Sequence, residues 1–178
     1  MERVFADTGY WIALLNPRDD LHHKATATSR SYSPDQIVTS EMVLTEFLNT
    51  FSDYGPRLRQ AAARAVASLR DTSQIVIVQQ TSQLFEKALK RYQDMTDKSW
   101  SLTDCASFLI MEEKRITAAL THDRHFAQAG FQTLLALIDH EASKRSLDST
   151  MRPPQPLLCS HYARASGLAA SGASRKNL

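Results

Sequence analysis

The sequence of 178 residues is poor in glycine and cysteine, and each shortage excludes some classes of protein. None of the five glycines falls in a Gly-x-Gly-x-x-Gly or Walker A pattern, which excludes the two common glycine-rich phosphate loops. The two cysteines, Cys105 and Cys159, form no Cys-x-x-Cys pair, so we expect no disulfide framework. A reducing cytoplasm is therefore the predicted compartment.

Long apolar runs, a secretion signal and common enzyme motifs are also missing. The apolar stretches are far shorter than the roughly 20 residues of a membrane span. The N-terminus, Met-Glu-Arg followed by a brief apolar segment, lacks the basic region and apolar core of a signal peptide. No His-Glu-x-x-His or Gly-x-Ser-x-Gly motif is present. We expect a cytoplasmic protein with no membrane partner, no zinc site and no serine nucleophile.

The composition is that of one folded domain with an extension. Hydrophobic residues make up 43% of the chain, enough for a core. Residues 1–138 carry 15 Lys and Arg against 16 Asp and Glu, a net charge of −1, whereas residues 139–178 carry six against three, a net charge of +3. This last segment is rich in Ser, Ala and Pro. We predict a domain over 1–138 and a flexible basic tail over 139–178.

Short apolar strands alternate with helices along the domain. The expected strands cover residues 3–6, 37–39, 74–78, 116–121 and 131–135. The expected helices cover residues 20–27, 42–51, 57–70, 84–92 and 101–115, and a short helix is expected after the fourth strand, before Gly130. Residues 10–15 form an apolar segment after the first strand. Asp19 or Asp20 is the expected cap of the helix over 20–27. This alternation predicts an α/β fold with a mostly parallel sheet of about five strands, covered on both faces.

Four acidic residues lie where a parallel sheet gathers functional groups. Asp7 follows the first strand and Asp123 the fourth, while Asp104 starts a helix and Glu46 lies in the helix after the second strand. Each has an ordinary explanation, as a turn, cap or surface residue. Because the carboxyl ends of parallel strands meet at one edge, the four together predict an acidic cleft.

Carboxylates in one cleft repel one another unless a cation lies among them. Oxygen ligands of this kind suit Mg²⁺ or Mn²⁺. Such an ion activates water and neutralises charge on a phosphodiester, so no nucleophilic side chain is required. The acids therefore indicate metal-dependent hydrolysis of a phosphodiester.

Four segments of the chain resemble one known family. They are Phe5-Ala6-Asp7-Thr8, SEMVLTEFLN with Glu46, SLTDCASFLIM with Asp104, and ALTHDRHFAQAGFQTLL with Asp123. In this order they resemble the PIN domain, and most of all its VapC-type toxin ribonucleases, over residues 3–137. The last two segments are quite specific, whereas Asp-Thr after a strand is weak by itself.

The resemblance implies a three-layer α/β/α sandwich with metal-dependent endoribonuclease activity. It also implies a homodimer and, for the toxin of a type II toxin–antitoxin pair, an antitoxin bound close to the active site. The matching acidic ligands are Asp7, Glu46, Asp104 and Asp123, and the matching supporting hydroxyls are Thr8, Ser101 and Thr103. Asp7 and Asp104 are the expected direct ligands. Glu46 would bind directly or through water and accept a proton from the attacking water, and Asp123 would complete the cleft.

RNA needs cations around an acidic cleft. The candidates are Arg57, Arg59, Arg64, Lys87, Lys90 and Arg91 on two helices, and His122 and Arg124 beside Asp123. Charged helices are more often solvated faces, which favours His122 and Arg124. The apolar stripe of Tyr10, Trp11 and Leu14 is expected in the core, although in the family such surfaces also serve dimerisation and antitoxin binding.

Two other functions fit the same acids. One is a PIN nuclease of RNA maturation or decay without an antitoxin, which the absence of a neighbouring antitoxin gene would favour. The other is a non-catalytic RNA- or protein-binding module, which would bind RNA without a divalent ion and leave it intact. A haloacid-dehalogenase-type phosphatase is rejected because Gly9 stands where it needs a second Asp, and a receiver domain because Thr121-His122 stands where it needs a Lys.

Overall fold

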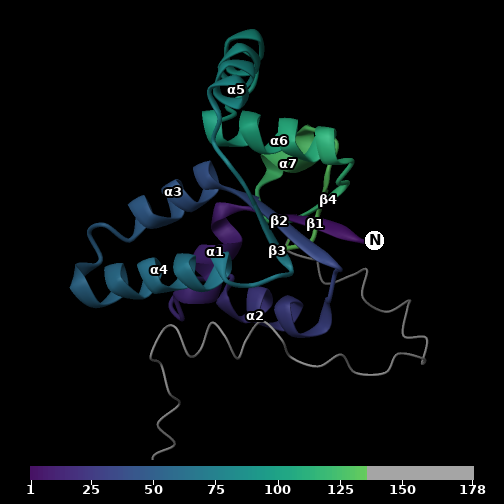
Figure 1. Cartoon of the computed structure of the whole chain (residues 1–178). Helices are drawn as coiled ribbons and strands as arrows, with labels where there is room; N and C mark the ends of the chain where they lie inside the picture. Colours follow the sequence, from purple (N-terminus) through teal and green to yellow (C-terminus); the bar gives the residue numbers. More distant parts are fainter. Residues whose placement is uncertain (136–178) are drawn as a thin grey trace, which may run out of the picture.

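The structure is a computed structural model that describes residues 1–135, arranged around one parallel sheet (Figure 1). The strands are β1 (Arg3–Ala6), β2 (Gln36–Ser40), β3 (Ile75–Val78), β4 (Ala118–Leu120) and β5 (Gln132–Thr133), in the order β3-β2-β1-β4-β5. Every neighbouring pair is parallel. The Val and Ile side chains of β2 and β3 suit a sheet that is covered on both faces. The predicted parallel α/β sheet is confirmed, while the predicted tail over 139–178 lies outside the described residues.

The helices cover both faces of this sheet. They are α1 (Thr8–Leu15), α2 (His22–Ser31), α3 (Glu41–Thr50), α4 (Gly55–Arg70), α5 (Ser82–Asp94), α6 (Leu102–Lys114) and α7 (Arg124–Gln128). In Figure 1, α6 and α7 lie on one side of the sheet and α1, α2 and α4 on the other. The α3 helix contacts both α1 and α6. The three-layer sandwich is therefore confirmed.

Side-chain caps start several helices where the sequence predicts them. Ser40 Oγ accepts a hydrogen bond from the Val43 N–H (3.2 Å) at the start of α3. Ser101 and Asp104 form a reciprocal capping box at the start of α6. These two predictions are confirmed, and the second fixes the position of a candidate ligand.

The cap predicted for α2 was wrong. This helix begins at His22 with Leu21 at the N-cap position, and no side chain caps it. Asp19 Oδ1 instead accepts from the Leu21 N–H (2.9 Å), and the Asp19 carbonyl accepts from the His22 N–H (2.9 Å). The acid therefore closes a turn ahead of the helix, because an Asp side chain readily binds the N–H two residues further on.

An aromatic cluster joins α6 and α7 to the sheet. Phe108 is fully buried, with its ring centroid 4.9 Å from that of Trp100, 5.0 Å from Phe126 and 5.7 Å from Phe131. Phe126 also packs on Phe5 of β1 (6.1 Å). The edge-to-face pairs add to the free energy of burial. This cluster holds α7 in place at the carboxyl end of β4.

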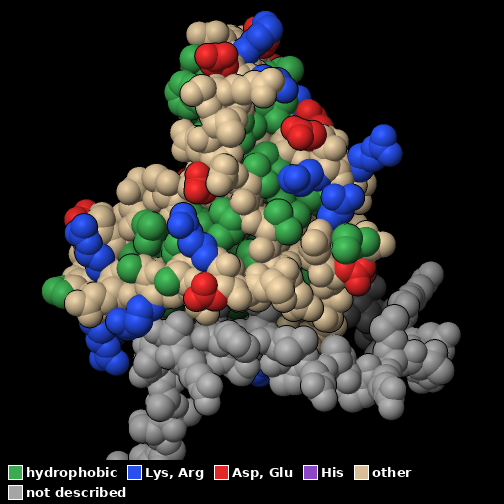
Figure 2. All heavy atoms as spheres, viewed as in Figure 1, with side chains coloured by type: hydrophobic (Ala, Val, Ile, Leu, Met, Phe, Trp, Pro, Cys, Tyr) green, Lys and Arg blue, Asp and Glu red, His purple; other side chains and the backbone are tan. Residues whose placement is uncertain are grey.

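The apolar residues of α1 and those of α5 differ in their exposure to solvent. Tyr10 and Trp11 are buried, so the stripe on α1 belongs to the core as expected, with Leu14 packed partly buried against it. The apolar face of α5 is instead largely exposed, as the hydrophobic side chains along this projecting helix in Figure 2 show. The exposed hydrophobic residues of α5 are Phe85, Leu89 and Tyr92, and Met95, directly after the helix, is exposed as well. Among residues 1–135, no helix is long and apolar enough to cross a membrane.

Candidate active site

A cleft of about 670 Å³ opens beyond the carboxyl ends of the central strands. In the register of the sheet, Ala6 of β1 lies beside Leu120 of β4, so the residues that follow the two strands meet. All four acids predicted from the sequence line the cleft, as do Thr8, Ser101, His122 and Arg124; Thr103 does not. The fold therefore gathers side chains from both ends of the domain.

Asp7 is one of two buried acids in the cleft: 9% of its surface is exposed, against 8% for Asp104. It occupies the N-cap position of α1, yet its carboxylate makes no capping hydrogen bond. Asp7 Oδ2 instead accepts from the Thr121 hydroxyl (2.9 Å). Burial raises the pKa of Asp7 from 3.8 to about 7; hydrogen bonds from the Thr8 backbone and Thr121 oppose this rise, while the charges of Asp104 and Glu46 add to it. Ionisation of this carboxyl group is thus unfavourable in the folded protein without a cation beside it.

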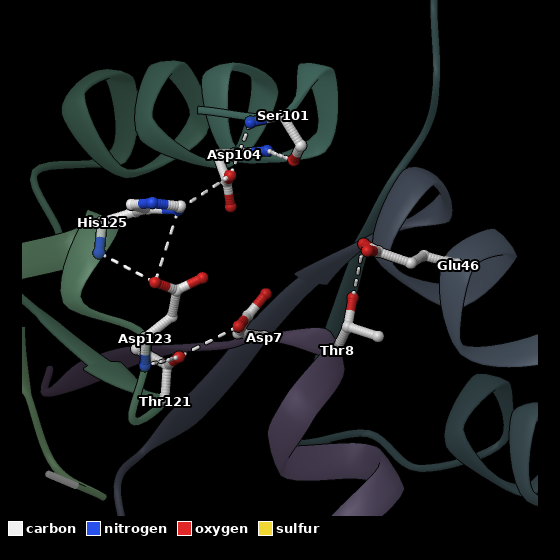
Figure 3. Close-up of polar contacts among 8 residues, drawn as sticks. All are labelled: Asp7, Thr8, Glu46, Ser101, Asp104, Thr121, Asp123 and His125. Atoms are coloured by element: carbon white, nitrogen blue, oxygen red, sulfur yellow. Dashed lines mark hydrogen bonds and ion pairs between the residues drawn. The ribbon is translucent and has the colours of Figure 1, made fainter. Parts of the chain in front are cut away.

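Asp104 and Asp123 both cap helices and face the same cleft. Asp104 Oδ2 accepts from the Ser101 N–H (2.7 Å), and Asp123 Oδ1 accepts from the His125 N–H (2.8 Å) at the start of α7. Their side chains are 12% and 36% exposed. In Figure 3 the other oxygens of these two carboxylates point toward Asp7. The ordinary capping explanation therefore holds for both acids, and it also orients them into the cleft.

Glu46 comes from α3 on the opposite side of the cleft (Figure 3). It is exposed, and its Oε2 accepts from the Thr8 hydroxyl (2.9 Å). The supporting position predicted for Thr8 thus contacts an acid directly. An exposed carboxylate at the rim can exchange protons with water.

His125 joins the acids, although the sequence did not single it out. Its Nδ1 lies 3.5 Å from Asp104 Oδ2 and 3.4 Å from Asp123 Oδ1. One ligand atom from each of Asp104, Asp123 and His125 can be chosen so that all lie within 4.8 Å of one another. Together with the buried Asp7 carboxylate beside them, this donor set fits a divalent cation.

The family follows from comparison with known proteins. Residues 4–132 match the PIN domain. The chain belongs to the PIN domain family. It is 32% identical to the 23S rRNA-specific endonuclease VapC20 of two Mycobacterium tuberculosis strains. The 128 aligned residues cover 72% of this chain and 95% of that protein. The crystal structure of M. tuberculosis VapC20, a sarcin–ricin loop cleaving toxin, matches with a TM-score of 0.65 and 31% identity over the same shares of the two chains. The resemblance to VapC-type toxin ribonucleases is confirmed.

The cations around this PIN-domain cleft differ in position. His122 and Arg124 are exposed and line the cleft, whereas Arg57, Arg59 and Arg64 of α4 are not among its lining residues. Arg91 makes a two-pronged ion pair with Glu112 (2.9 and 2.8 Å), and Lys90 pairs with Asp94 (3.0 Å). Of the basic residues predicted to contact RNA, His122 and Arg124 are therefore the two that lie at the cleft.

Thr121 is a second site residue of the PIN domain that sequence reasoning missed. Its buried hydroxyl donates to Asp7 and accepts from the Asp123 N–H (3.0 Å), so it ties the first acid to the last. The only signal in the sequence was its place at the end of the fourth predicted strand. The contact with Asp7 spans 114 positions, which no local pattern reveals.

Replacing Thr121 by Val should weaken the site while keeping the shape of the side chain. The Asp123 N–H would lose its acceptor, at a cost of about 1–3 kcal/mol in the free energy of unfolding. Misplaced carboxylates should lower RNA cleavage by roughly 10–100-fold, as other supporting contacts to metal ligands do. Urea unfolding and a cleavage time course measure the two effects. Thr72→Val, which removes a hydroxyl bonded to the Ser68 carbonyl at the end of α4, is the matched control; equal losses in both variants would contradict the role of Thr121.

Proposed function

We propose that this PIN-domain protein is a metal-dependent endoribonuclease and the toxin of a type II toxin–antitoxin pair. The observation that carries the proposal is the Asp7 carboxylate, which is buried beside other acids and caps no helix. A folded chain gains no stability from an ionised acid held in this way. A bound cation accounts for its position, and the family supplies the chemistry.

Asp7, Asp104 and Asp123 would hold Mg²⁺ or Mn²⁺, with Glu46 bound directly or through water. When bound, the ion lowers the pKa of water and offsets negative charge on the phosphodiester. Glu46, exposed at the rim, accepts the proton of the attacking water. The capping bonds of Asp104 and Asp123 keep their carboxylates in place before substrate arrives, which lowers the entropic cost of reaching the transition state.

The proposed substrate is structured RNA, and 23S rRNA is the first target to test, because the similar VapC20 is specific for it. His122 and Arg124 would contact phosphates beside the scissile bond, since both line the cleft. Arg57, Arg59 and Arg64 on α4 would bind RNA only further from the reaction centre. The cytoplasm is the proposed compartment for such an activity.

We also propose two protein partners, an antitoxin that binds close to the cleft and a second copy of the chain. The exposed apolar side chains of α5 support a partner of this kind, because they lie on one helical face. Light scattering of the purified protein would reveal a homodimer as twice the chain mass. Capture of a protein encoded beside this gene would test the antitoxin.

Cleavage of an RNA pool with a sarcin–ricin-type hairpin tests the function. Purified protein is incubated with RNA in Mg²⁺, in Mn²⁺ and in EDTA, beside Asp104→Asn as a contamination control. We expect cleavage that requires the metal and is absent in the variant. Cleavage that persists in EDTA, or in Asp104→Asn, would contradict the proposed site.

Absence of cleavage by a folded, metal-bound protein would point to the non-catalytic module. RNA binding in EDTA, measured by fluorescence anisotropy, then decides. Binding that needs no metal and leaves RNA intact would replace the nuclease by that module.

A further inference from the structure

His125 stands out because its ring nitrogen Nδ1 is buried in the cleft without a hydrogen-bond partner. Nδ1 has essentially no solvent exposure and makes no hydrogen bond, although the side chain as a whole is 17% exposed. It faces two carboxylate oxygens, at 3.5 and 3.4 Å, beyond good hydrogen-bond geometry. A buried polar atom left unsatisfied among acids calls for an explanation.

The distances from Nδ1 to the two carboxylate oxygens are close to those between neighbouring ligands of a metal ion. Two atoms in neighbouring positions of an octahedral ion at about 2.1 Å lie roughly 3 Å apart, so the observed distances need to shorten by only about half an ångström. The capping bonds fix the carboxylates of Asp104 and Asp123 on either side, as Figure 3 shows. The imidazole therefore sits between two anchored oxygen ligands.

We propose that His125 is a nitrogen ligand of the ion in this cleft, completing a mixed site with Asp104 and Asp123. This inference rests on the proposed function and adds to it a preference among metals. Mg²⁺ favours oxygen ligands, whereas an imidazole nitrogen strengthens binding of first-row transition ions. With His125 bound, the site favours Mn²⁺ over Mg²⁺.

The backbone makes His125 easy to test without loss of the helix. The hydrogen bond that starts α7 comes from the His125 N–H, not from its ring, so a substituted side chain leaves it in place. His125→Phe keeps a ring of similar size and removes the nitrogen. His125→Asn is a second, polar variant for the case that Phe disturbs folding. His122→Phe, in the same cleft, is the matched control.

Pulsed EPR of the full chain loaded with Mn²⁺ gives a readout independent of catalysis. We expect a ¹⁴N coupling from a directly bound imidazole in the unchanged protein and in His122→Phe, and its loss in His125→Phe and His125→Asn. In a Mn²⁺ titration, His125→Phe should weaken binding by roughly 10–100-fold, as expected for loss of a contact that builds a metal site. The change for Mg²⁺, measured by competition with Mn²⁺, should be smaller.

Other outcomes separate the two proposals. A ¹⁴N coupling that survives in His125→Phe, or Mn²⁺ binding that is unchanged or tighter in that variant, would overturn the ligand role of His125. Mn²⁺ binding unaffected by Asp104→Asn would instead place the ion outside the cleft and contradict the proposed function itself. Loss of binding in Asp104→Asn alone would uphold the function and overturn only the role of His125.

Discussion

Asp7→Asn should abolish RNA cleavage and make the metal-free protein more stable at neutral pH. Loss of a carboxylate from the proposed metal site should lower the cleavage rate by at least roughly 10³-fold, equivalent to about 4 kcal/mol of transition-state stabilisation. The gain in stability has a separate cause. Burial raises the pKa of Asp7 to about 7, so ionisation of this group is unfavourable in the folded state.

The sign of the pH dependence follows from this rise. The folded protein holds the Asp7 proton more tightly than the unfolded chain, so its contribution to stability is fully present below pH 3.8 and is lost as the pH rises to about 7. A shift of this size corresponds to about 4 kcal/mol. Asn does not ionise. In EDTA at pH 8, the free energy of unfolding of Asp7→Asn should therefore exceed that of the unchanged protein by up to this amount. At pH 4 the two proteins should differ little.

Urea unfolding in EDTA at the two pH values measures the effect, because every other titrating group is common to both proteins. Asp53→Asn, an exposed acid between α3 and α4, is the control and should change stability by less than about 0.5 kcal/mol. Adding Mn²⁺ should stabilise the unchanged protein and not Asp7→Asn. A stability difference that does not depend on pH would show that burial of the Asp7 charge is not its cause.

Phe108→Ala should cost about 3–5 kcal/mol in the free energy of unfolding, a large part of the 5–15 kcal/mol typical of a domain. Phe108 is fully buried and contacts three other rings, so its removal leaves a cavity that the neighbours cannot fill. One of those rings, Phe126, belongs to α7, which also carries His125. Cleavage should therefore become more sensitive to heat than in the unchanged protein.

Phe85→Ala provides the matched change on a surface. Phe85 is 39% exposed on α5, and its truncation should cost less than about 1 kcal/mol. Thermal and urea unfolding of both variants, followed by circular dichroism, give the comparison. Equal costs at the two positions would contradict the central place of Phe108 in the core.

Local patterns explain which parts of the site the sequence could predict. Asp104 was found because Ser-x-x-Asp is a capping signal contained in four residues, and the structure has that capping box. Asp7 and Asp123 were found because strand ends gather functional groups in parallel sheets. Thr121 was missed because its role arises only when residues far apart in the chain meet, and His125 because only the structure shows that its Nδ1 is buried without a hydrogen bond.

The same reasoning explains the differences in the fold. Alternating strands and helices predicted the sheet, because hydrophobic patterning reflects burial. The cap of α2 was misplaced because Asp19 can satisfy either a turn or a helix, and the sequence does not distinguish them. The apolar side chains of α5 have the spacing of a core face, yet most of them are exposed. Periodicity shows that a helical face is apolar, not whether another element covers it.

The central position of β1 makes the cleft a late product of synthesis. This strand precedes the other four strands of the sheet in the chain, but one of its neighbours, β4, begins at Ala118. A nascent or truncated chain that ends before β4 contains Asp7 and Glu46 but neither Asp123 nor the strand whose end buries Asp7. Such a chain has no assembled cleft. If the protein has the proposed nuclease activity, the order of translation therefore delays that activity until the domain is nearly complete.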